Sequence, residues 1–148
     1  MILPDFKGFP RSGRIIGIDW GARRVGVAVS DESREFVFVR DVIKLGRCDD
    51  AAMIVARMAI EERVVGIVVG LPLYADGTES ETTKMVRVFV VDLSEKTDLP
   101  IVMVEENLTS VVAQESMGRV RVRDIKEKLD SESARVILEN AIALINRA

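Results

Sequence analysis

The chain of 148 residues contains no histidine and only one cysteine, Cys48. Without histidine, the Ser–His and Cys–His nucleophile pairs and the usual histidine-ligated zinc sites are excluded. A single cysteine cannot form an internal disulfide, which suits a reducing compartment such as the cytoplasm. Any catalysis must therefore depend on carboxylates, lysines or metal-bound water.

Long hydrophobic runs are also missing, since no apolar stretch approaches the roughly 20 residues that span a bilayer. Residues 1–13 contain Pro4, Gly8 and Pro10 and lack the apolar core of a signal peptide. We therefore expect a flexible N-terminal leader followed by a single domain over residues 14–148. With 48% hydrophobic and 30% charged residues, the composition is typical of a soluble globular protein. The net charge of −3 gives no overall attraction to nucleic acid, although a local basic patch is sufficient for phosphate contacts.

The first three predicted strands are β-branched or aromatic runs separated by short polar turns: Ile15–Asp19, Val25–Ser30 and Phe36–Ile43. These turns are too short for crossovers, so the strands should be antiparallel neighbours. Two further apolar runs, Val64–Val69 and Pro100–Val104, are expected to be strands covered on both faces.

Four helices are expected around these strands. Asp49 caps the first, which runs to about Arg63 with Ile54 and Met58 facing inward. Thr78 and Glu81 form a capping-box pair for the second, with an inner face that includes Met85, Phe89 and Leu93. A short helix starts at Thr109 or Ser110 and ends at Gly118, and the last runs from about Asp130 to Asn146. The order predicts a mixed five-stranded sheet flanked by helices, the topology of the ribonuclease H-like fold.

Three carboxylates are predicted to converge at one edge of this sheet. Asp19 ends the first strand, and Glu106, or its neighbour Glu105, follows the strand that starts at Pro100. Asp130 lies at the head of the last helix, on the face that carries Ala134 and Ile137. Ligands bind beyond the carboxyl ends of parallel strands. Three carboxylates there suit Mg²⁺ or Mn²⁺, and two such ions would support phosphodiester hydrolysis without histidine.

Each of these residues also has a purely structural interpretation. Asp19 could be an Asx-type turn residue, Glu105 and Glu106 could be solvated, and Asp130 could be a helix N-cap. Their joint placement at one edge favours a site. The alternation within a strand buried on both faces does not distinguish Glu105 from Glu106.

Basic residues follow in the sequence close to these carboxylates. Arg23 and Arg24 occupy the turn after Asp19, and a segment from residue 119 to 128 carries five basic and two acidic side chains. The basic ones are Arg119, Arg121, Arg123, Lys126 and Lys128. They could guide a polyanion to the site, or the segment could be a solvated loop.

Four motifs resemble those of the YqgF/RuvX family of ribonuclease H-like nucleases, in the same order along the chain. The opening motif is Gly17-Ile18-Asp19-Trp20-Gly21-Ala22-Arg23-Arg24-Val25-Gly26-Val27-Ala28. The second is Val69-Gly70-Leu71-Pro72 with Asp76-Gly77-Thr78, and the third is Glu105-Glu106-Asn107-Leu108-Thr109. The last is Asp130-Ser131-Glu132-Ser133-Ala134, followed by Ile137-Leu138-Glu139.

The resemblance implies a bacterial cytoplasmic protein that trims the 5′ end of precursor 16S rRNA, from a family once described as Holliday-junction resolvases. It implies that Asp19, Glu106 and Asp130 bind the metal and that Thr109 lies among the residues that contact nucleic acid. The chain departs from the family where Glu105 replaces Asp and Asn107 replaces Arg. The loss of that arginine is expected to affect the rate of cleavage or the binding of substrate more than the fold.

Three other functions are compatible with parts of this pattern. A DNA junction resolvase uses the same chemistry but needs a dimer, and the chain could be a monomer or a homodimer. A non-catalytic nucleic-acid-binding module could share the fold. Actin-like ATPases also carry Gly-Ile-Asp-x-Gly, but they need two such lobes and 148 residues supply one.

Overall fold

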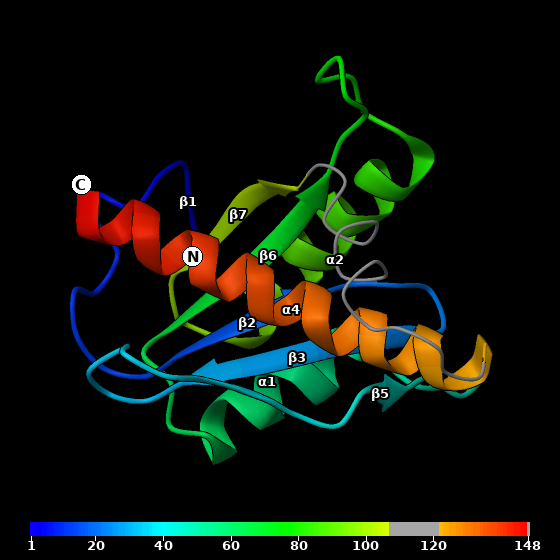
Figure 1. Ribbon diagram of the computed structural model, residues 1–148, viewed down its shortest axis with the longest axis horizontal. Helices are drawn as coiled ribbons and strands as arrows, with labels where there is room; N and C mark the ends of the chain where they lie inside the picture. Colours follow the sequence, from blue (N-terminus) through cyan, green and yellow to red (C-terminus); the bar gives the residue numbers. More distant parts are fainter. Residues whose placement is uncertain (107–121, 148) are drawn as a thin grey trace.

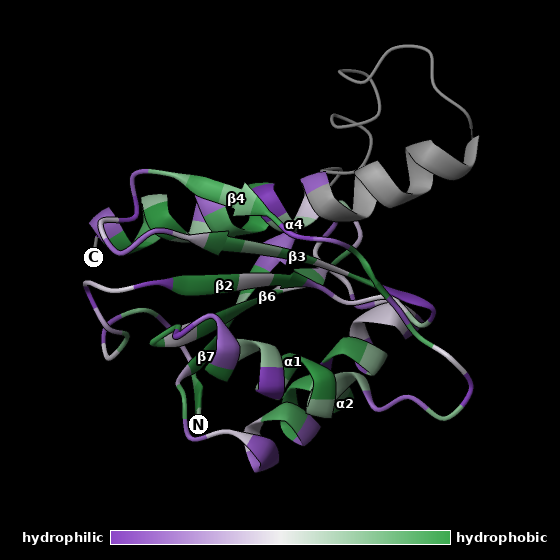
Figure 2. Ribbon diagram, turned by 90° about the horizontal axis from the view of Figure 1, so that it is seen from below, coloured by the Kyte–Doolittle hydropathy of each residue, from purple (hydrophilic) through white to green (hydrophobic). Residues whose placement is uncertain are grey.

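The computed structural model describes residues 1–106 and 122–147 and, for residues 122–131, the backbone alone. The described residues form three layers: one long helix on one face of a central sheet and two helices on the other (Figures 1 and 2). The helices are α1 Ala51–Glu61, α2 Glu81–Lys96 and α4 Val122–Arg147. In this part of the chain, no helix is both long enough and apolar enough to cross a membrane.

The sheet is mixed, as the sequence predicts. The strands are β1 Ile2–Leu3, β2 Ile15–Asp19, β3 Arg24–Ser30, β4 Val37–Val39, β5 Ile43–Lys44, β6 Gly66–Pro72 and β7 Ile101–Glu106. Their order across the sheet is β1-β7-β6-β2-β3-β4, and β5 pairs with β3. The pairs β2–β3 and β3–β4 are antiparallel, whereas β2–β6 and β6–β7 are parallel. The three parallel strands β2, β6 and β7 therefore end at the same edge of the sheet.

Two details of the strands differ from the prediction. The expected third strand, Phe36–Ile43, is divided into β4 and β5, which pair with opposite ends of β3. The expected flexible leader is wrong for its first residues, because β1 pairs in parallel with β7. Phe9 is also buried, with 3% of its surface exposed, and packs where a Cβ on Gly66 would lie 2.3 Å from its ring.

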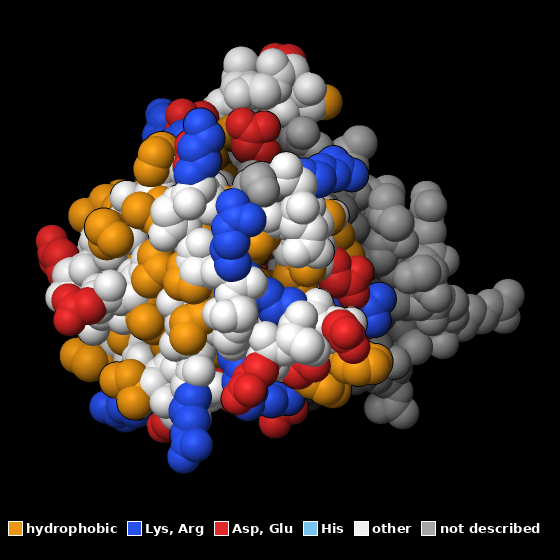
Figure 3. Space-filling model, turned by 90° about the vertical axis from the view of Figure 1, so that its left-hand side faces the viewer, with side chains coloured by type: hydrophobic (Ala, Val, Ile, Leu, Met, Phe, Trp, Pro, Cys, Tyr) orange, Lys and Arg blue, Asp and Glu red, His pale blue; other side chains and the backbone are white. Residues whose placement is uncertain are grey.

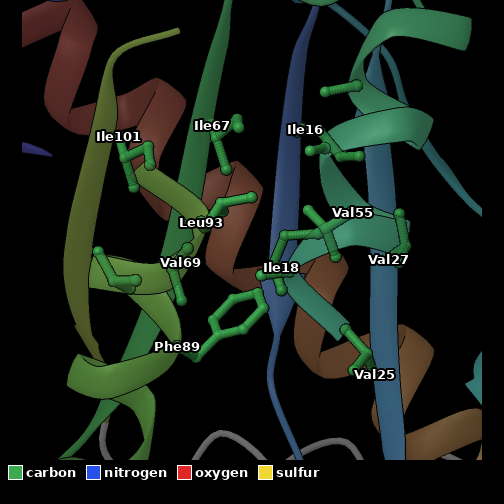
Figure 4. Packing of buried hydrophobic residues seen from close by; sticks show 14 of the residues in the cluster. Ile16, Ile18, Val25, Val27, Val55, Ile67, Val69, Phe89, Leu93 and Ile101 are labelled. Carbon is green, nitrogen blue, oxygen red and sulfur yellow. The ribbon is translucent and has the colours of Figure 1, made fainter. Parts of the chain in front are cut away.

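The core between the sheet and helices α1 and α2 consists of alternate residues of each strand. Ile16 and Ile18 of β2 point to this side, as do Val25 and Val27 of β3 and Val69 of β6 (Figure 4). The alternation is regular because successive strand residues point to opposite faces. This set of contacts holds α1 and α2 against one face of the sheet.

The inner face of α1 is rotated by about one residue from the predicted one, whereas the inner face of α2 is largely as predicted. In α1, the buried residues are Ala52, Val55, Ala56 and Ala59. In α2, Phe89 and Leu93 are buried as predicted, together with Val86 and Val90, whereas Met85 is 47% exposed. The prediction chose the largest apolar side chains, but the close packing of α1 on the sheet favours small ones.

The caps of these helices also differ from the prediction by one or two residues. Asp50, not Asp49, caps α1 and accepts a hydrogen bond from the Met53 amide. At the start of α2, the capping box is formed by Ser80 and Thr83. The predicted short helix ending at Gly118 lies outside the described residues.

Helix α4 covers the opposite face of the sheet with the predicted stripe. Its buried apolar residues are Ala134, Ile137, Leu138, Ala141 and Ile145, and Ser133 is buried beside them. The helix starts at Val122, earlier than predicted, so Asp130 lies inside it and the N-cap interpretation is wrong. Residues 122–128, expected to lie in a basic segment before the helix, form its first turns.

Candidate active site

Asp19 and Glu106 lie on the same side of the sheet, facing α4. In β2, Ile16 and Ile18 pack toward α1 and α2, so Asp19 shares the opposite face with Ile15 and Gly17. In β7, Val102 and Val104 pack toward α4, and Glu106 continues this alternation. Both carboxylates also lie at the ends of their strands. The structure therefore brings these two predicted residues to one face of one edge.

The same alternation separates Glu105 from Glu106. Glu105 is exposed and belongs to the face of Met103, which packs toward α1 and α2. Glu106 belongs to the face of Asp19, and one of its carboxylate oxygens lies 3.0 Å from where a Cβ on Gly70 would be. The position of α4 thus distinguishes the two glutamates, which the strand pattern alone does not.

Glu106 is largely buried at the strand end. Desolvation by this burial raises the pKa of its carboxyl to about 7. Burial disfavours the charged form of a carboxylate, and a nearby cation favours it. The site therefore holds a group whose protonation is sensitive to a positive charge at this edge.

Two strand residues beneath α4 are glycines, and their lack of a side chain allows the helix to pack closely against the sheet. A Cβ on Gly17 would lie 2.8 Å from Cβ of Leu138 and 3.0 Å from the carbonyl oxygen of Ala134. A Cβ on Gly70 would lie 2.4 Å from Cδ1 of Ile137. The sequence pattern gave these glycines no role, although a glycine inside a strand is a known signal of close backbone approach.

Asp130 lies in α4 one helical turn before Ala134, the residue whose carbonyl oxygen approaches Gly17. Four residues rise about 6 Å along the axis. Helix α4 contacts β3, in which Gly26 is the strand partner of Asp19. The backbone of Asp130 thus belongs to the helix that covers both carboxylates, while its side chain is outside the described atoms.

No group of three or more acidic, cysteine or histidine side chains forms a metal cluster among the residues whose side chains are described. The chemistry of the donors nevertheless fits a hard divalent cation, because Asp19 and Glu106 offer carboxylate oxygens on one face. The burial of Glu106 agrees with this, since a cation would offset the cost of its charge.

Of the residues predicted to contact nucleic acid, Arg23 and Arg24 lie at this edge. Arg23 is exposed in the turn between β2 and β3. Arg24 is half-buried and shares the α4-facing side of β3 with Gly26 and Ala28. Arg123, Lys126 and Lys128 lie in the first turns of α4, with undescribed side chains, and Thr109, Arg119 and Arg121 lie outside the described residues.

The end of the molecule opposite this edge looks different. It faces the viewer in Figure 3, where Lys and Arg side chains are scattered singly among hydrophobic and acidic ones. Affinity for a phosphate backbone increases with the number of Lys and Arg side chains that contact it. This end of the molecule lacks such a group on the face shown.

Contacts with α2 fix the loops next to the two carboxylates. Trp20, directly after Asp19, packs against Phe89 of α2 with ring centroids 6.3 Å apart. The Thr83 hydroxyl donates a hydrogen bond to the carbonyl of Pro72, which pairs with Glu106 in the sheet. These contacts fix the edge from the face that α2 covers, and α4 covers the other face.

A family model described as "RuvX: Holliday junction resolvase" matches residues 13–143. The chain belongs to the RuvX family. Membership places it among nucleases, which are phosphodiester hydrolases, and confirms the resemblance found in the four motifs. The matched range includes Asp19, Glu106 and Asp130.

Proteins similar to this RuvX chain occur in several bacteria. One from Maridesulfovibrio salexigens, named "Putative pre-16S rRNA nuclease", is 37% identical over 132 residues, which are 88% of this chain and 98% of that protein. A protein of the same name from Agrobacterium fabrum is 35% identical over 86% of this chain and 82% of its own.

Solved structures of resolvases share the fold. Thermus thermophilus RuvC in complex with a Holliday junction substrate matches with a TM-score of 0.53 and 13% identity, over 90% of this chain and 96% of that one. The Fowlpox virus resolvase in complex with Holliday junction DNA matches with a TM-score of 0.50 and 12% identity, over 89% and 99%. At this identity the likeness establishes the ribonuclease H-like fold of the RuvX chain.

Proposed function

We propose that this chain is a metal-dependent endonuclease that hydrolyses phosphodiester bonds in structured RNA, with precursor 16S rRNA as its substrate. The observation that carries the proposal is the placement of Asp19 and Glu106 on one face of the sheet edge, beneath α4. Two carboxylates at converging strand ends are a suitable base for a divalent metal site. The relatives named as pre-16S rRNA nucleases support the choice of substrate.

Asp19, Glu106 and Asp130 are the residues that would hold Mg²⁺ or Mn²⁺, and the proposal includes two ions. When bound, such ions supply an activated water and stabilise the leaving oxygen of a phosphodiester. Burial raises the pKa of the Glu106 carboxyl to about 7, so this group would release its proton when a metal ion binds. Asp19 is fixed by its strand and by Trp20, which packs on α2.

The substrate contacts are proposed at the same edge. Arg23 and Arg24 flank Asp19 and provide positive charge where a phosphate backbone would approach. Thr109, Arg119, Arg121, Arg123, Lys126 and Lys128 are proposed to extend this contact along the substrate. Since phosphate contacts carry no sequence information, selection of the cleavage position would come from RNA structure.

Cleavage of two labelled substrates by wild type and Asp19→Asn, with Mg²⁺ or Mn²⁺, tests this function. One substrate is a 5′ fragment of precursor 16S rRNA and the other is a four-way DNA junction. We expect defined cuts in the RNA, which EDTA abolishes and Asp19→Asn reduces at least a hundredfold. Glu105→Gln is the matched control, because Glu105 is exposed on the other face and should retain activity.

Other outcomes lead to other functions. Paired cuts in the junction would move the function to DNA recombination, which the family description and the resolvase neighbours favour as the second candidate. If neither substrate is cut and both proteins bind RNA equally well, the chain is a non-catalytic binding module.

A further inference from the structure

The outer face of α2 carries an exposed apolar stripe with charged ends. Val88 is 70% exposed and Val91 51%, although both are apolar and β-branched. Such residues stabilise a solvent-facing helix less than Ala, Lys or Glu does. Lys84 lies four residues before Val88, and Glu95 lies four residues after Val91. The spacing of four, three and four places all these side chains in one line along the helix.

This stripe faces away from the protein's own core. The buried residues of α2 include Val86, Val90 and Leu93, which lie on the opposite side of the helix. Figure 2 shows α1 and α2 as the outer layer on their side of the sheet. A shallow hollow of about 450 Å³ runs along the stripe, lined by Val88 and Val91 with Arg87, Asp92 and Glu95. The stripe is therefore a surface that another helix could cover.

The charges on this face are divided between its two halves. Lys84 and Arg87 lie in the N-terminal half, and Asp92 and Glu95 lie in the C-terminal half. Within the chain, Arg87 is paired with Glu79 at 2.8 Å and Asp92 with Lys96 at 2.6 Å. Lys84 and Glu95 are therefore the charges that bear on a second copy. Glu81, 3.4 Å from Lys84, lies one turn before the stripe begins. An antiparallel copy of the helix would place Lys84 of each copy against Glu95 of the other, whereas a parallel copy would oppose Lys84 to Lys84 and Glu95 to Glu95.

We propose that α2 pairs with α2 of a second copy of this chain, antiparallel, around a two-fold axis that passes between Phe89 and Val90. In this register, Val88 lies opposite Val91 of the second copy, and Lys84 lies opposite Glu95. Each contact occurs twice because the interface is isologous. Packing of the valines removes the exposed apolar stripe from water, and the flanking ion pairs fix the register.

The pairing determines how far apart the two copies hold the sheet edges that carry Asp19 and Glu106. The start of α2 lies at this edge, since Thr83 donates a hydrogen bond to Pro72 at the end of β6. Antiparallel pairing therefore places the two edges at opposite ends of the helix pair. A helix of 16 residues is about 24 Å long. The two sites would work on separate phosphodiesters rather than side by side on one.

Sedimentation velocity of the full chain over a series of micromolar concentrations tests the pairing. Two valine contacts and two ion pairs make a small interface, which predicts a weak dimer, so the average mass of wild type should rise toward twice the monomer mass as the concentration increases. Val88→Glu should remain monomeric, since it buries a charge against Val91 of the second copy. Ile60→Glu is the matched control: Ile60 is 75% exposed on α1, outside the stripe, and this variant should dimerise like wild type.

A charge exchange tests the register. Lys84→Glu places like charges opposite each other and should weaken the dimer about tenfold or more, which corresponds to 1.4 kcal/mol. The double variant Lys84→Glu/Glu95→Lys restores opposite charges in the antiparallel register and should recover the dimer. Wild type that stays monomeric throughout, a dimer that survives Val88→Glu, or an exchange that recovers nothing would overturn the proposal. Circular dichroism checks that all variants are folded.

Discussion

Glu106 combines a role in the proposed site with a cost to the folded protein. Its pKa is raised by burial from 4.5 to about 7, so the folded chain binds this proton more tightly than the unfolded chain does. The resulting stability is fully present below about pH 4.5 and is lost as the pH rises through 7. Above that range, ionisation of Glu106 costs about 3 kcal/mol in the absence of metal.

Replacement of Glu106 by Gln should therefore stabilise the metal-free protein at high pH. At pH 8, we expect the free energy of unfolding of Glu106→Gln to exceed that of wild type by up to about 3 kcal/mol. At pH 5, the two proteins should unfold at similar urea concentrations. The same variant should lose metal-dependent cleavage. Urea denaturation in EDTA across this pH range measures the first effect.

Glu105→Gln is the comparison for this experiment. Glu105 is exposed, so its replacement should leave the pH dependence of stability as in wild type. If Glu106→Gln retains the full loss of stability between pH 5 and 8, the burial of Glu106 is not its cause.

The positions of the strand-end carboxylates could be predicted from the sequence, but the choice between Glu105 and Glu106 could not. Both lie at the end of β7, after a run of apolar residues on both faces of the strand, so neither the pattern nor the composition shows which face is the inner one. The side is defined by α4, whose Ala134 and Ile137 come from the other end of the chain. The choice between the two glutamates depends on the contact of α4 with the sheet, which the periodicity of a single strand cannot show.

At the scale of elements, the contact between α4 and the sheet depends on glycine in β6. A Cβ on Gly70 would lie 2.4 Å from Cδ1 of Ile137 and 3.0 Å from a carboxylate oxygen of Glu106. We expect Gly70→Ala to destabilise the protein by about 1–3 kcal/mol, because the added methyl displaces the helix or forces Ile137 off its rotamer. Urea denaturation measures this loss.

Removal of the Ile137 Cδ1 atom should relieve the clash. The double variant Gly70→Ala/Ile137→Val should lose less stability than the two single changes together, and this difference is the coupling. Gly8→Ala serves as a control, since the nearest atom to its Cβ would be 3.9 Å away. Additive single changes would show that Gly70 and Ile137 do not meet.

The order and type of the central elements could be predicted because turns and apolar runs are local signals. The faces of α1 and the start of α4 could not. In α1 the buried positions include three alanines, which carry little hydrophobic signal compared with Ile54 and Met58. The start of α4 at Val122 precedes its buried stripe by three turns of mostly polar residues, in which only Val122, Ile125 and Leu129 have helical spacing, and the prediction started the helix at Asp130 instead.

At the scale of the whole molecule, the first residues belong to the fold. Proline and glycine in residues 1–13 indicated a flexible leader, because both are common in irregular segments. The structure instead pairs Ile2 with Ile101, and a hydrogen bond joins the Ile101 amide to the Met1 carbonyl at 2.8 Å. An irregular segment can still contribute a strand and an anchor when tertiary contacts fix it.

Phe9 is that anchor, and its removal should destabilise the whole chain. It is 3% exposed, lies over Gly66 and contacts Phe6 edge-to-face with ring centroids 5.3 Å apart. We expect Phe9→Ala to cost about 3–5 kcal/mol, because the ring leaves a cavity above a glycine that cannot fill it. Phe36→Ala, at a phenylalanine that is 61% exposed, should cost less than 1 kcal/mol. Urea denaturation compares the free energies of unfolding of the two variants. If both changes cost equally little stability, residues 1–13 do not anchor the fold and the flexible leader predicted from the sequence is correct.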